Sequence, residues 1–195
     1  MKSITPVRLF AMLATALALP AVAHAHSSSS IIYDCASGVA HPFHGWDHLA
    51  AMLAVGVWAA QLGGRARALV PAAFVTVMMC AALVGARGIV FPGVEPMIAT
   101  SVLTLGVLIA AATRMPLAAS VTVVSFFAAA HGFAHGSEMP VNAGAFSYTA
   151  GFVLATAALH ALGLGIGHLA LGRSPHFPRA LGAVCAAAGT ALLFA

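Results

Sequence analysis

Residues 41–60, HPFHGWDHLAAMLAVGVWAA, place a polar cluster directly before an apolar segment. Three histidines and one aspartate occupy the first eight positions, and the residues after them are almost all apolar. Ionisable groups inside a membrane helix are costly, so they usually face a polar cavity or pair with one another. The stretch therefore indicates an apolar helix with a functional polar group near its start.

The composition of the whole chain indicates an integral membrane protein. Of its 195 residues, 62% are hydrophobic and only 6% are charged, whereas a soluble domain carries about 25% charged residues. The formal net charge is +4, but the eight basic residues are scattered between apolar runs and form no patch. We therefore expect a lipid bilayer as partner and exclude nucleic acid.

The first 25 residues have the pattern of a secretory signal peptide. Lys2 and Arg8 are followed by a short apolar run, and small residues at Ala23 and Ala25 suit a cleavage site. The rival interpretation is an uncleaved membrane helix, but the apolar run is short for a span. We predict a signal peptide over residues 1–25 and one transmembrane domain over residues 26–195, with a polar segment outside the cytoplasm at its start.

Six apolar segments have about the 17 to 25 residues that a bilayer-spanning helix needs. They are residues 42–62, 69–85, 95–113, 116–136, 143–172 and 178–195. Prolines lie at or near several of their starts, where the first helical turn tolerates them. The predicted fold is all-α: a polytopic membrane helical bundle of six transmembrane helices after an N-terminal signal peptide.

The loops give the predicted orientation in the membrane. Signal cleavage would place the mature N-terminus outside the cytoplasm, in the periplasm of a bacterium, with the domain in the inner (cytoplasmic) membrane. Five of the six arginines after the signal then lie in cytoplasmic loops, as the positive-inside rule requires: Arg65, Arg67, Arg114, Arg173 and Arg179. The acids Asp34, Glu95 and Glu138 lie at the outer side, where they would attract cations.

The polar cluster at the start of the first span is expected to form one ridge. His44 and His48 are four residues apart, and His44 and Asp47 are three apart. Residues at these spacings share a helix face. With His41 at the helix entrance, the ridge would contain His41, His44, Asp47 and His48.

A second polar cluster lies at the predicted outer end of the fourth span, in the sequence HGFAHGSE of residues 131–138. His131, His135 and Glu138 are spaced to share one face. Gly132 and Gly136 form a row of small residues beside them, which lets another helix approach closely. The first span is the natural neighbour, so the two clusters are expected to converge at one membrane depth.

Imidazoles with one or two carboxylates suit a borderline divalent cation such as Ni²⁺, Co²⁺ or Zn²⁺. Spacing alone does not choose among these ions. Each residue also has an ordinary interpretation: His41 as an interface residue, Glu138 as a solvated loop residue, and a single membrane histidine as an interhelical hydrogen-bonding group. The whole constellation at one depth favours metal binding.

His160 and His168, in the fifth predicted span, are candidates for an inward translocation path. They are eight residues apart and would lie at successive depths. Successive weak sites allow an ion to move and to be released. The alternative is two packed histidines in a glycine-rich helix, and the sequence leaves both interpretations open.

The two polar stretches closely resemble motifs of the HupE/UreJ family of nickel permeases. The first family motif matches His41, Pro42, Gly45, Asp47, His48, Ala51, Met52, Val55 and Gly56, and the second matches His131, Gly132, Ala134, His135, Gly136 and Glu138. His44 falls at a variable position. The resemblance implies uptake of Ni²⁺, or of Co²⁺ in some members, indirectly serving nickel enzymes such as hydrogenase and urease. It also implies that the matched histidines and acids handle the metal.

The leading hypothesis is a permease that imports Ni²⁺ or Co²⁺ from the periplasm across the inner membrane, with the ion as substrate and no organic cofactor. The chain contains no GxxxxGK[ST] loop, so it is not itself a P-loop ATPase. The alternatives are an intramembrane zinc-dependent hydrolase, although HExxH and GxSxG are both missing, and a haem-binding electron carrier. The sequence leaves open whether the chain forms a homo-oligomer.

Overall fold

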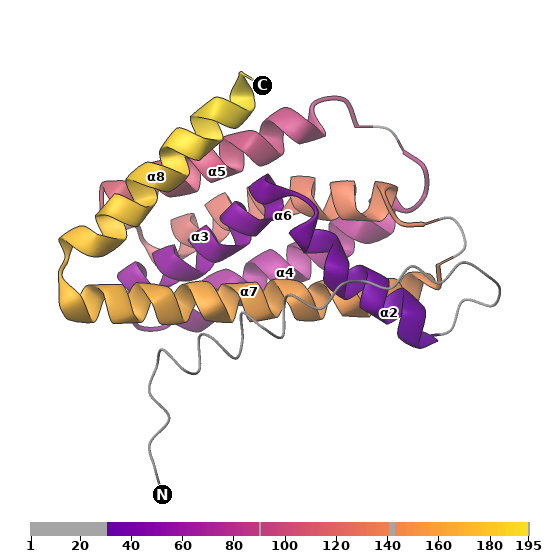
Figure 1. Ribbon diagram of the computed structural model, residues 1–195, viewed down its shortest axis with the longest axis horizontal. Coiled ribbons are helices and arrows are strands. Elements are labelled where there is room, and N and C mark those ends of the chain that lie inside the picture. The colour runs from indigo at the N-terminus through magenta and orange to yellow at the C-terminus, as the bar shows by residue number, and fades with distance from the viewer. Residues whose placement is uncertain (1–30, 90, 141–142, 195) are drawn as a thin grey trace, which may run out of the picture.

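The computed structural model describes residues 31–89, 91–140 and 143–194, and within these ranges the chain is helical, as predicted (Figure 1). Its elements, in chain order, are α2 (Ile31–Ala40), the 3₁₀ turn η1 (His41–Phe43), α3 (Trp46–Leu62), α4 (Ala66–Gly85), α5 (Val94–Ala110), α6 (Leu117–Ser137), α7 (Ala145–Arg173) and α8 (His176–Leu193). The predicted signal peptide over residues 1–25 lies outside the described residues.

Three of these helices are long and apolar enough to cross a membrane, namely α4, α6 and α7, and α5 is a shorter apolar helix. This agrees with a multi-pass membrane protein. The remaining predicted spans correspond in position to α3, α5 and α8, and the passage of these three helices through the membrane stays a prediction.

The chain between residues 31 and 45 differs from the sequence prediction. The segment expected to be polar and external contains a helix, α2, and the first predicted span begins at Trp46 instead of residue 42. The break has a local cause: His41–Phe43 form a 3₁₀ turn that contains Pro42, and Gly45 is extended, with φ −116° and ψ 121°, at the start of α3. Because the N-cap residue of a helix has a non-helical backbone, Gly45 separates the 3₁₀ turn from α3.

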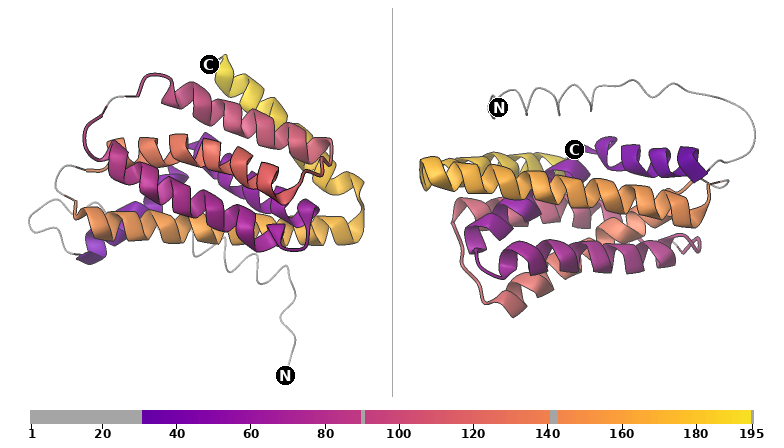
Figure 2. Two further views of the ribbon diagram at one scale, coloured as in Figure 1. Left: turned by 180° about the vertical axis from the view of Figure 1, so that it is seen from behind. Right: turned by 90° about the horizontal axis from the view of Figure 1, so that it is seen from below.

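Close helix pairs hold the bundle together, with α4 against α6, α5 against α8, and α3 against α7 (Figures 1 and 2). Gly132 and Gly136 allow one of these approaches, because a Cβ atom at either position would collide with the carbonyl of Met78 or Ala82. The predicted row of small residues therefore exists, but its neighbour is α4 and not the helix that carries Asp47. A glycine row indicates a close neighbour without specifying which one.

Helix α2 packs along the first half of α7 (Figure 1). Asp34 is buried and accepts a hydrogen bond of 2.8 Å from the backbone N–H of Gly144, immediately before α7 begins. A carboxylate at this position accepts a hydrogen bond from a backbone N–H that the helix leaves unpaired, and its charge complements the positive end of the helix dipole. This contact fixes α2, and α2 in turn places His41 above the ends of α3 and α6.

Candidate functional site

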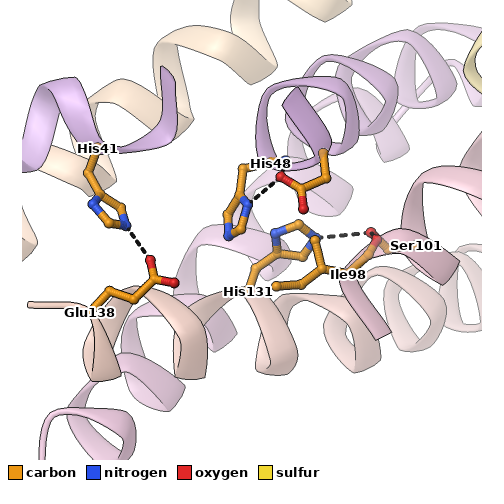
Figure 3. Close-up of polar contacts among 7 residues, drawn as sticks. His41, His48, Ile98, Ser101, His131 and Glu138 are labelled. Carbon is orange, nitrogen blue, oxygen red and sulfur yellow. Dashed lines mark hydrogen bonds and ion pairs between the residues drawn. The ribbon is translucent and has the colours of Figure 1, made fainter. Parts of the chain in front are cut away.

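His48 is the centre of the candidate site, because it joins the two polar clusters of the sequence (Figure 3). It lies in the first turn of α3, and its ring centroid is 5.0 Å from that of His131 and 4.7 Å from that of His135. His131 and His135 are one turn apart on α6, and all three side chains are buried. Three imidazoles from two helices therefore form one continuous buried cluster.

His41 extends this cluster towards the end of the bundle. Its ring lies 4.8 Å from that of His135, and its Nε2 is 3.0 Å from Oε2 of Glu138, which follows the last residue of α6 (Figure 3). The hydrogen bond from His41 lowers the pKa of the Glu138 carboxyl, and partial burial opposes this shift. Glu138 therefore holds a negative charge at the outer edge of the cluster.

Asp47 orients His48. Its Oδ1 lies 2.8 Å from Nδ1 of His48 and also accepts the backbone N–H of the same residue at 2.7 Å. Because a carboxylate only accepts, Nδ1 carries the proton and the lone pair of His48 is on Nε2. Carboxylate–histidine pairs of this kind fix the ring and raise its basicity as a metal ligand. The geometry makes Asp47 the hydrogen-bond partner that orients His48.

Ser101 on α5 plays the matching role for His131. Its hydroxyl lies 2.6 Å from the Ile98 carbonyl, to which it donates, and 2.9 Å from Nε2 of His131 (Figure 3). Because the hydroxyl proton is used, the oxygen accepts from Nε2–H of His131, which leaves the lone pair on Nδ1. Ser101 is not among the residues predicted from the sequence, since one serine in an apolar helix carries no distinctive signal.

Several buried ring nitrogens have no hydrogen-bond partner within the part of the chain that the structure describes. They are His48 Nε2, His131 Nδ1 and both nitrogens of His135 and of His160. A buried polar atom without a partner costs about 1–3 kcal/mol. Two of these nitrogens, His48 Nε2 and His131 Nδ1, are the atoms to which the lone pairs were assigned above. The cluster therefore offers imidazole donors that a cation could use.

A cavity of about 290 Å³ opens onto this cluster. Its lining residues are His41, His44, Gly45, Asp47, His48, Glu95 and Glu138. Glu95, in the first turn of α5, was predicted only as an acid on the outer side and not as a site residue. Three carboxylates in one cavity concentrate cations near the histidines. The cavity thus has the charge and the donors of an entrance for a divalent ion.

The predicted ridge of four residues on one helix is wrong in its geometry. His44 precedes the extended residue Gly45, so it does not share a helix with Asp47 and His48. His44 is exposed, and its ring lies 6.3 Å from that of His41. Nor do three or more His, Cys, Asp or Glu side chains among the described residues form a ready group for one metal ion. The imidazoles are contiguous without converging on a single point.

The two histidines of the predicted path lie in different surroundings. His160 is 2% exposed, and its ring lies 5.0 Å from that of Phe74, whereas His168 is exposed. Eight residues of an α-helix amount to a net rotation of roughly 80°, which is enough to turn one side chain inward and the other outward. Of the pair, only His160 lies in the bundle interior.

Known proteins are similar to this chain over nearly its whole length. The family described as HupE / UreJ protein matches residues 12–192. The chain is 45% identical to Protein HupE of Rhizobium leguminosarum bv. viciae over 179 residues, which cover 91% of this chain and 93% of the relative. No solved structure matches the chain. The residues matched by the family, 12–192, span both polar clusters.

Proposed function

We propose that this chain, which belongs to the HupE/UreJ family of metal-ion permeases, imports Ni²⁺ through the histidine cluster around His48. The members of this family are permeases and not enzymes, so membership does not favour the alternative of an intramembrane zinc hydrolase. The ion is the substrate, with Co²⁺ or Zn²⁺ as competing candidates, and no organic cofactor takes part. Nickel enzymes such as hydrogenase or urease would be indirect beneficiaries.

The observation that carries this proposal is the position of His48 between His131 and His135, with centroid separations of 5.0 and 4.7 Å. Buried imidazoles on two helices provide successive nitrogen donors, which suit Ni²⁺, Co²⁺ and Zn²⁺ better than Mg²⁺ or Ca²⁺. Contiguous donors that do not converge on one point favour passage over tight retention, because conduction needs binding weak enough for release.

The proposed direction is inward from the periplasm across the inner membrane, with the mature N-terminus in the periplasm. The cavity with Glu95 and Glu138 would be the outer entrance. An inside-negative potential of about 100 mV favours entry of a divalent cation by roughly 4.6 kcal/mol, at about 2.3 kcal/mol per charge. Uptake therefore needs no nucleotide hydrolysis by this chain.

The test is uptake of radiolabelled Ni²⁺ and Co²⁺ in a host without its own transporter. Asp47→Ala, His48→Ala and His135→Ala should each lower uptake at least about tenfold, the range seen when ligands and their partners are removed from metal sites. His176→Ala is the matched control, because this histidine is exposed at the start of α8. Unimpaired uptake by all three site variants at equal membrane expression would refute the proposed site.

A further inference from the structure

A second group of side chains, of types that can bind metal ions, lies in the interior, where α3, α4 and α7 meet. The hydroxyl of Thr156 on α7 lies 3.5 Å from the sulfur of Met52 and 3.9 Å from the sulfur of Met78. All three residues are 0% exposed. Two thioether sulfurs from different helices therefore meet at one buried hydroxyl.

His160 lies one helical turn after Thr156 on the same face of α7. It is 2% exposed, and neither ring nitrogen has a hydrogen-bond partner within the described ranges. Its backbone is also held tightly, because a Cβ atom at Gly56 of α3 would collide with the His160 carbonyl. His160 is therefore a fixed, buried imidazole that makes no hydrogen bond to the described residues and has a nitrogen lone pair free to bind a metal ion.

Phe74 connects this interior group to the outer cluster. Its ring is fully buried and lies 5.6 Å from the ring of His131 and 5.0 Å from that of His160. Phe74 and Met78 are one turn apart on α4. One phenyl ring therefore contacts the last histidine of the outer cluster and the histidine of the inner group.

One member of the inner group also borders a groove that is separate from the entrance cavity. His160 lines a groove of about 440 Å³ between α4 and α7, and Arg67, near the start of α4, lines the same groove. Arg67 belongs to the loop and helix start predicted to face the cytoplasm. The groove thus reaches from His160 towards the side on which an imported ion would be released.

We propose that Met52, Met78 and His160 form an inner thioether–imidazole site that an ion reaches after the outer histidines and that selects against hard cations. The proposal rests on the proposed function and assigns a further part of its selectivity to a second set of residues. Thioether sulfur and imidazole nitrogen bind borderline and soft ions such as Ni²⁺ and Co²⁺, whereas Mg²⁺ and Ca²⁺ require oxygen ligands. The outer cavity contains carboxylates that also attract Mg²⁺, so a later site with sulfur ligands would add to the discrimination that the outer imidazoles provide.

The test replaces both sulfurs while it keeps side-chain volume. Uptake of radiolabelled Ni²⁺ is measured against increasing Mg²⁺ for the wild type and for the double variant Met52→Leu, Met78→Leu. The Mg²⁺ concentration that halves uptake should fall at least about tenfold, since selectivity is a difference of affinities. Met79→Leu is the matched control, because Met79 is the residue after Met78 on α4 but its side chain is 39% exposed. An unchanged Mg²⁺ competition curve in the double variant would overturn the inner site.

A second measurement does not depend on transport or on the folding of the methionine variant. X-ray absorption at the nickel edge, on purified full-length His48→Ala protein loaded with Ni²⁺, should reveal sulfur in the coordination shell. A shell of nitrogen and oxygen alone would overturn the proposal. The proposed function fails in a separate way, namely if the wild type takes up no Ni²⁺; normal wild-type uptake without sulfur coordination would reject the inner site only.

Discussion

His48 on α3 and His131 on α6 lie with ring centroids 5.0 Å apart, and each has one ring nitrogen bound to a neighbouring oxygen and the other without a partner in the described structure. The oxygen is a carboxylate at His48 and a hydroxyl at His131. Two different helices therefore use the same device, in which a supporting oxygen fixes the tautomer and leaves a lone pair within the cluster.

The first prediction concerns the hydroxyl that supports His131. Ser101→Ala removes the acceptor for Nε2–H, so the ring loses its fixed tautomer and orientation. We expect apparent Ni²⁺ affinity in uptake assays to fall about 10- to 100-fold, the range for loss of a supporting partner. Ser101→Thr keeps the hydroxyl and should restore most of the affinity, which a purely steric role would not allow.

The matched control for this prediction is Ser137→Ala. Ser137 lies on α6, is exposed and donates only to the Ala134 carbonyl of its own helix. Its loss should leave uptake unchanged. If Ser101→Ala behaves like Ser137→Ala, the role given to the hydroxyl is wrong.

The second prediction concerns the long-range charge of Glu95. Glu95 lines the entrance cavity from the first turn of α5. Glu95→Gln should lower the rate of Ni²⁺ uptake at low ionic strength by a few-fold and should have little effect at about 0.15 M salt or above, where the Debye length is about 8 Å. Uptake measured against salt concentration checks this. A loss that persists at high salt would instead indicate direct coordination by Glu95.

Much of this site follows from residue spacing. Histidines one helical turn apart on α6, at the same expected depth as Asp47 and His48, predict that the two clusters meet, and their rings do lie within 5.0 Å. The break at Gly45 was not predicted, because the pattern from residue 41 onward is also compatible with one continuous helix. Its consequence is that His44 lines the entrance cavity from the turn before α3 and not from α3 itself.

The partners of the small-residue row and of His131 could not be read from the sequence for a different reason. Gly132 and Gly136 require a close neighbour, but every apolar helix in the chain could supply one. Ser101 is a single small polar residue in an apolar helix, where serine commonly bonds to its own backbone. Only the three-dimensional arrangement places its hydroxyl 2.9 Å from His131.

The third prediction concerns pH and the contact between His41 and Glu138. The hydrogen bond from His41 lowers the pKa of Glu138 below its ordinary value of 4.5. A carboxyl whose pKa is lower in the folded state stabilises that state above its unfolded pKa, and the contribution disappears as pH falls through the folded pKa. Glu138→Gln should therefore lower thermal stability at neutral pH and lose this effect in acid.

The measurement is thermal unfolding of both proteins in detergent between about pH 7 and pH 3, a range that spans the ordinary carboxyl pKa. The difference between the two melting temperatures should be largest at neutral pH and should shrink below about pH 4.5. A difference that grows in acid would contradict the assigned direction.

The last prediction concerns the space that Gly45 leaves for the pair beside it. A Cβ atom at this position would lie 2.6 Å from Oδ1 of Asp47 and 3.0 Å from Nδ1 of His48. The backbone of Gly45, with φ −116° and ψ 121°, is open to alanine, so any effect of Gly45→Ala must come from contact with these two side chains. We expect a folded protein whose Ni²⁺ uptake is reduced about tenfold or more, since the pair must shift from the position that orients the lone pair of His48. Gly165→Ala is the control, because a Cβ atom there would meet nothing within 4 Å. Equal uptake by both variants, with equal expression and equal melting temperatures, would show that transport does not depend on the exact placement of Asp47 against His48.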